Sequence, residues 1–96
     1  MNKSEIIQIL QQNKSFMEKN FGVKSLGIFG SVARETEVTD SDIDILVELK
    51  EPKYDWWAGL LNFLQDKLGH KVDLITKGNH LSDRFLKRVS KDLINV

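Results

Sequence analysis

Apolar residues follow two different spacings along the chain, and stretches with the two spacings alternate. Three stretches have helical spacing: residues 3–21, 54–68 and 82–95. Three short apolar runs are typical of strands: residues 23–29, 43–49 and 71–76. Taken in sequence, they give the order α-β-β-α-β-α. This order predicts the α/β (α+β) class, with a small mixed β-sheet flanked by helices.

Residues that start or stop helices lie at the ends of these stretches. Asn2 and Glu5 have the spacing of a capping box, in which each side chain bonds the other's backbone N–H. Gly22 and Gly69 follow helical stretches and are predicted to end them. Pro52 stands where a helix can begin, because its missing N–H is not needed in a first turn.

Composition narrows the class of protein. The chain has 96 residues with 14 basic and 14 acidic side chains, and it has no cysteine. The length predicts a single domain over residues 1–96, and the balanced charge argues against direct nucleic-acid binding. Without an apolar leader or a membrane-spanning run, we expect a cytoplasmic protein with no membrane partner.

The strongest candidate chemistry lies at the start of the second predicted strand. Asp42 and Asp44 are two positions apart, so in a strand their carboxylates lie on one face while Ile43 and Ile45 lie on the other. Two neighbouring carboxylates repel unless a cation lies between them. Mg²⁺ commonly takes one or two carboxylates together with substrate phosphates. The pair therefore indicates a magnesium site, although Asp near a strand start often only closes a loop.

A phosphate-binding turn is predicted just upstream. Gly30 and Ser31 follow the first strand and can open a helical turn, whose free N–H groups attract anions. Alone, a Gly-Ser pair is usually only a turn. Arg34 either reaches the phosphate or is only a surface residue of that turn. Ser41 either joins the site or only holds its loop by a local hydrogen bond. Trp56 faces away from the apolar stripe. It could stack on a nucleotide base or pack on a partner, but packing on the flank of the helix is the favoured prediction.

Asp73 lies inside the third predicted strand, where a charged residue is unfavourable. If this strand lies beside the second, Asp73 meets Asp42 and Asp44 and completes a set of three carboxylates. If it does not, Asp73 is an ordinary charged residue on a solvated face of the sheet. The sequence does not show the strand order.

Together, residues 30–34 (GSVAR), 41–47 (SDIDILV) and 72–75 (VDLI) resemble the minimal nucleotidyltransferase (MNT-type) family. This family belongs to the DNA polymerase β-like nucleotidyltransferase superfamily. The resemblance runs from about Lys24 to Thr76 and implies the nucleotidyltransferase fold. The family often has glycine after the arginine, where this chain has Glu35.

The resemblance implies a role for each matching residue. Ser31 and the backbone at Gly30 would hold the phosphates of ATP, with Arg34 and Ser41 as further nucleotide-binding candidates. The three catalytic and metal-binding residues would be Asp42, Asp44 and Asp73. The first two would bind two Mg²⁺ ions, and Asp73 would join one ion and help to activate an acceptor hydroxyl.

The resemblance also implies a partner. Members of the family are often antitoxins of HEPN-type toxins and add AMP to a toxin tyrosine. We therefore expect a Mg²⁺-dependent nucleotidyltransferase that modifies a HEPN toxin. Two alternatives stay open at this point: a non-catalytic antitoxin that acts by contact alone, and nucleotidyl transfer to a small molecule or an RNA end.

Overall fold

The computed structural model describes residues 2–35 and 42–96, and it confirms the predicted class. The helices are α1 (Lys3–Gln12), α2 (Lys14–Phe21), α3 (Gly30–Arg34), α4 (Tyr54–Leu68) and α5 (Asp83–Asp92). The strands are β1 (Val23–Phe29), β2 (Ile43–Leu49), β3 (Val72–Thr76) and β4 (Ile94–Asn95). In this part of the chain, no helix is long and apolar enough to cross a membrane.

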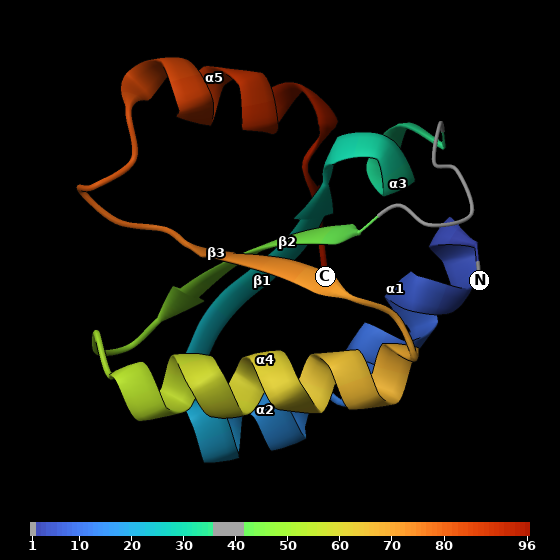
Figure 1. Cartoon of the computed structure of the whole chain (residues 1–96), viewed down its shortest axis with the longest axis vertical. Coiled ribbons are helices and arrows are strands. Elements are labelled where there is room, and N and C mark those ends of the chain that lie inside the picture. The colour runs from blue at the N-terminus through green and yellow to red at the C-terminus, as the bar shows by residue number, and fades with distance from the viewer. Residues whose placement is uncertain (1, 36–41) are drawn as a thin grey trace.

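Within the described residues, the strands form one mixed sheet in the order β3-β2-β1-β4. Strand β2 runs antiparallel to β1 and parallel to β3, and β4 runs antiparallel to β1. Helices α1, α2 and α4 lie on one side of the sheet, and α3 and α5 lie on the other (Figure 1). The sheet is therefore the middle layer of three.

The two sides of the sheet are packed differently. The α4 side holds most of the core, whose most deeply buried side chains include Ile6, Leu10, Met17, Leu60, Leu64 and Leu68. On α5, Val89 is buried, whereas Phe85 and Leu86 are only half-buried. Fully burying one such side chain stabilises the fold by roughly 1.5–3 kcal/mol. Most of the folding free energy therefore comes from the α4 side, and α5 is held to the sheet more lightly.

Strand β3 lies at an edge of the sheet, and side chains of α4 cover backbone groups there. The Trp57 Nε1–H donates to the Leu74 carbonyl at 3.1 Å, and the Val72 N–H donates to Gln65 Oε1 at 3.1 Å. Unpaired groups on an edge strand are a template for other chains. These two hydrogen bonds satisfy such groups from within the molecule.

The first helical stretch, predicted as one helix over residues 3–21, is two helices. The capping box at Asn2 and the stop at Gly22, which has φ of 61°, are both confirmed. The break is at Asn13, whose backbone leaves the helical region with φ of −106° and ψ of 6°. Its side-chain amide donates to the Ile9 carbonyl at 2.8 Å. Short amide side chains compete in this way with the helical backbone for its acceptors.

The last helix is shorter than the predicted stretch of residues 82–95. Ser82 caps its start, and the helix ends at Asp92. It ends there because residues 94–95 form β4, which pairs with residues 27–28 of β1. Helix α4 has its predicted bounds and stops at Gly69, where φ is 64°.

Candidate functional site

The candidate residues meet at the end of the sheet where β1 finishes and β2 and β3 begin. The register pairs Phe29 with Asp44, and Asp44 with Asp73. Partners on neighbouring strands point to the same face, and Ile43 and Ile45 are buried on the opposite one. The strand order that brings Asp73 beside Asp44 is therefore confirmed.

Gly30 brings the turn after β1 into contact with Asp44. Its φ is 72°, in the left-handed region that side chains other than glycine rarely adopt. A Cβ atom at this position would overlap Asp44 Oδ2 and lie 3.0 Å from Asp44 Cγ. The carboxylate thus lies directly on the glycine backbone, and glycine is needed both for the turn and for this contact.

The electrostatics of the site centre on Asp44. Its pKa is raised above the ordinary value of 3.8, first by burial and then by the like charges of Asp73 and Asp42. The Arg34 guanidinium acts in the opposite direction. Burial and like charge both disfavour an ionised carboxylate. A cation bound beside Asp44 would therefore be favoured.

A cavity of about 540 Å³ lies between this end of the sheet and α5. One side is formed by Gly30, Ser31, Arg34, Asp44 and Asp73. The other side is formed by Phe85, Arg88, Lys91 and Asp92 of α5. Two carboxylates on the sheet therefore face a wall that carries cations, across a space open to a ligand.

Arg34 connects α3 to α5. Its Nη1 donates to Asp92 Oδ2 at 2.8 Å, and the side chain also lines the cavity. The residue after it, Glu35, has φ of 60°. This left-handed conformation is the one that glycine adopts most easily, and in this chain a glutamate adopts it.

For two predicted site residues, Ser41 and Asp42, the outcome differs from that of the others. Ser41 lies outside the described residues. Asp42 is half-buried just before β2 and acts electrostatically on Asp44, but it does not line the cavity. Among residues 2–35 and 42–96, no group of three Asp, Glu or His side chains is arranged to hold a metal ion by itself.

The residues that do line the cavity still suit Mg²⁺. Asp44 and Asp73 offer carboxylate oxygens only, and hard divalent cations prefer oxygen ligands. Mg²⁺ is usually bound by one or two carboxylates plus substrate phosphates, and seldom by an all-protein cage. The donor set therefore fits an ion whose remaining ligands are oxygens of a bound phosphate group.

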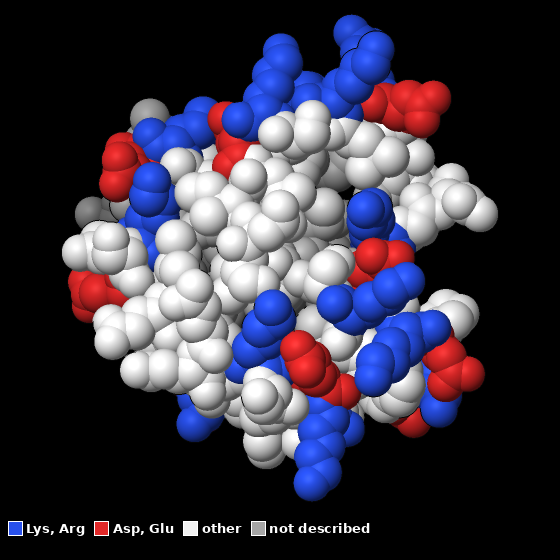
Figure 2. Space-filling model, turned by 180° about the vertical axis from the view of Figure 1, so that it is seen from behind, with Lys and Arg blue, Asp and Glu red and all other residues white. Residues whose placement is uncertain are grey.

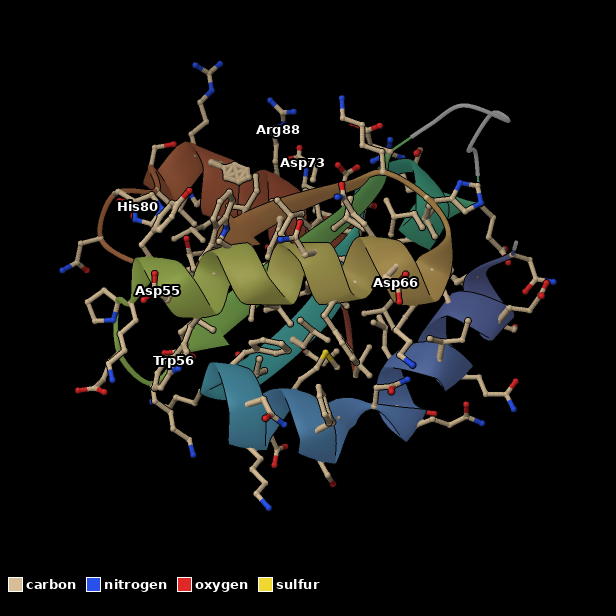
Figure 3. All side chains as sticks on the ribbon, turned by 60° about the horizontal axis from the view of Figure 1, so that its bottom comes forward. Asp55, Trp56, Asp66, Asp73, His80 and Arg88 are labelled. Atoms are coloured by element: carbon tan, nitrogen blue, oxygen red, sulfur yellow. The ribbon has the colours of Figure 1, made fainter. Side chains whose placement is uncertain are left out.

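Trp56 lies away from the cavity, on α4 (Figure 3). Its ring packs over Gly22 at the end of α2, and the Lys53 ammonium lies 4.6 Å from the ring centroid. The predicted flank packing of Trp56 is confirmed.

Sequence reasoning missed the wall that α5 contributes. Among its ten residues, α5 carries four basic side chains: Arg84, Lys87, Arg88 and Lys91. Lys and Arg gather at the α5 end of the molecule, at the top of Figure 2. A basic helix was visible in the sequence, but which of its residues face the aspartates depends on how α5 docks.

The comparisons with known proteins agree with this geometry. Residues 4–95 match the family model described as a nucleotidyltransferase domain. A candidate protein adenylyltransferase of Methanocaldococcus jannaschii is 45% identical over 97% of this chain and 96% of its own length. The protein adenylyltransferase MntA of Thermococcus cleftensis is 37% identical over 96% of this chain and 93% of its own length.

Solved structures show the same fold. A candidate minimal nucleotidyltransferase superposes with a TM-score of 0.84 and 28% identity, covering 100% of this chain and 97% of that one. A complex from Shewanella oneidensis contains a tri-AMPylated HEPN toxin and an MNT antitoxin. One of its chains matches with a TM-score of 0.59 and 22% identity, over 98% of this chain and 67% of that one. At 22% identity, this likeness is evidence for a shared fold alone.

Proposed function

The chain belongs to the nucleotidyltransferase domain family, and we propose that, as one domain over residues 1–96, it transfers AMP from ATP to a hydroxyl group of a partner protein. The protein adenylyltransferases that it resembles along nearly their whole length support this choice of donor and acceptor. The observation that carries the proposal is the arrangement of Gly30, Asp44 and Asp73 around one cavity.

The transfer is an in-line displacement at the α-phosphorus of ATP. The acceptor oxygen forms a bond to this phosphorus while the bond to the oxygen bridging the α- and β-phosphates breaks. Pyrophosphate leaves, and the proton of the hydroxyl passes to the Asp73 carboxylate. Ser31 and the backbone at Gly30 position the phosphates. Such a reaction depends mainly on positioning and charge neutralisation, which a small domain can supply.

The bound Mg²⁺ would neutralise charge on the phosphates, and two such ions would do so on both the attacking and the leaving oxygen. Asp44 and Asp73 would hold the metal, and Asp42 would join them from the edge of the cavity. Gly30 keeps the Asp44 carboxylate in place for this task, because no side chain displaces it.

The partner that we propose is a HEPN-type toxin, with this chain as its antitoxin. The support is the shared fold with a chain of a complex that contains an AMP-modified HEPN toxin. A toxin hydroxyl that receives AMP would account for neutralisation without a permanent complex.

The test is a transfer assay with ATP labelled at the α-phosphate, Mg²⁺ and an extract of the host. Asp44→Asn removes a metal-binding charge while keeping the side-chain shape, and it should abolish labelling. Asp66→Asn is the matched control, because Asp66 is exposed on α4, away from Asp73 (Figure 3). Labelling of one protein by the wild type and by Asp66→Asn supports the proposal.

Other results of the same assay would redirect the proposal. Label in RNA or in a small molecule would replace the protein acceptor. Equal labelling by Asp44→Asn would refute the assigned site. If no label appears although a partner protein co-purifies, inhibition by contact alone is the better explanation.

A further inference from the structure

Arg88 and Lys91 of α5 have no role in the function described so far. They are three positions apart, so they lie on the same face of the helix, and both line the cavity. In Figure 3, Arg88 of α5 and Asp73 of β3 lie in the same region of the molecule, and both line the cavity. The two cations therefore occupy the wall opposite the aspartates.

Neither cation is paired with an acidic side chain of the described residues. Within residues 2–35 and 42–96, Arg34 and Asp92 pair with each other, while Arg88 and Lys91 form no ion pair. The end of α5 carries the partial negative charge of a helix C-terminus, so the backbone does not attract an anion here. Any attraction for an anion on this wall comes from these two side chains.

The charges in the cavity suit the parts of a nucleotide triphosphate. The Arg34–Asp92 pair is internally neutral, and Asp44 and Asp73 would be matched by the bound metal. This leaves two cations for the negative charge of the phosphate chain. An Arg guanidinium binds phosphate oxygens through two parallel N–H bonds, and Lys binds them as a point charge.

We propose that Arg88 and Lys91 form the subsite that binds the β- and γ-phosphates of ATP and then the departing pyrophosphate. This inference rests on the proposed function, because it assigns the far end of the same substrate. In an in-line displacement, the leaving group lies opposite the acceptor. With the reacting phosphorus held by Asp44 and Asp73, the leaving phosphates would extend toward the α5 side of the cavity.

Three contacts hold α5 against the rest of the domain beside the proposed subsite. Val89, which lies between Arg88 and Lys91 in the sequence, is buried. Phe85 packs edge-on against Phe29, with ring centroids 6.2 Å apart. The Arg34–Asp92 ion pair holds the end of the helix to α3, next to Ser31. These contacts place Arg88 and Lys91 across the cavity from the turn that begins at Gly30.

The test compares two double variants with the same loss of charge from the same helix. Arg88→Gln/Lys91→Gln removes the cations that line the cavity. Arg84→Gln/Lys87→Gln is the control, because these residues do not line it and Lys87 lies by a separate surface depression. Binding of ATP, AMP and inorganic tripolyphosphate is measured by calorimetry with Mg²⁺, and circular dichroism verifies that each variant is folded.

The cavity variant should bind ATP and tripolyphosphate at least tenfold more weakly than the wild type, because each charge-assisted phosphate contact contributes strongly. Its affinity for AMP should stay within about twofold, as should the affinity of the control variant for all three ligands. A variant that retains AMP binding is folded at the site, so the loss can be assigned to the β- and γ-phosphates.

Three results would overturn the inference. Unchanged ATP affinity in the cavity variant would refute it while leaving the proposed function intact. An equal loss in the control variant would mean that net charge, and not the subsite, is responsible. Failure of the wild type itself to bind ATP would overturn the proposed function, and this inference with it.

Discussion

Replacing Gly30 with alanine separates the strain of its backbone from its contact with Asp44. The matched control is Gly69→Ala, since Gly69 has a similar φ of 64° against 72° for Gly30. A Cβ atom at Gly69 would have no neighbour within 4 Å, whereas one at Gly30 would overlap the Asp44 carboxylate. The two variants thus share the cost of a left-handed alanine and differ in the overlap.

The structure sets the size of each effect. A left-handed conformation costs a residue other than glycine roughly 1–2 kcal/mol, which is the loss in unfolding free energy expected for Gly69→Ala. Overfilling a packed site typically costs a further 1–3 kcal/mol or so. That second cost applies at Gly30, because the new atom would lie 3.3 Å from Asp44 Cβ, which is tied to the backbone of β2.

Thermal unfolding followed by circular dichroism would measure the difference. In a domain of this size, each kcal/mol corresponds to roughly 4–8 °C in Tm, so Gly30→Ala should melt well below Gly69→Ala. The displaced carboxylate should also abolish AMP transfer, whereas Gly69→Ala should retain it. Equal melting temperatures together with full transfer by Gly30→Ala would refute the assigned contact.

Two further predictions follow from Asp44 and Trp57. The raised pKa of Asp44 means that the folded protein binds this proton more tightly than the unfolded chain. The wild type should therefore lose stability relative to Asp44→Asn as pH rises above 3.8. Urea unfolding at several pH values without divalent metal measures the two free energies of unfolding. A wild type that gains stability relative to Asp44→Asn over this range would contradict the prediction. Trp57→Phe leaves the Leu74 carbonyl without its donor, so unfolding free energy should fall by about 1 kcal/mol, whereas an unchanged value would mean that water replaces the bond.

Local chemistry in the sequence was enough to predict most of the elements. Gly22 and Gly69 each adopt the left-handed conformation that ends a helix, as expected of glycine after a periodic stretch. The break at Asn13 was missed because apolar spacing continues across it, and the non-helical backbone there is accompanied only by a local hydrogen bond from the Asn13 side chain to Ile9.

The site was predictable only where its residues are close in sequence. Alternation of Asp44 with Ile43 and Ile45 fixes which face the carboxylate occupies. Its register with Asp73 depends on the strand order, and the contribution of Arg88 depends on how α5 docks. Both are long-range arrangements that no local pattern encodes.

The covered edge of β3 determines how an acceptor can approach. An extended segment of a partner would ordinarily add to an edge strand through backbone hydrogen bonds. Here Trp57 and Gln65 already engage the Leu74 carbonyl and the Val72 N–H, so a partner strand would find fewer free backbone groups beside Asp73. For the proposed reaction, we therefore expect the acceptor hydroxyl to enter over the end of the sheet, on a side chain that projects from its own protein. Selection of the acceptor then depends on the reach of that one side chain and on the surface around it, and not on the sequence of a strand laid along the enzyme.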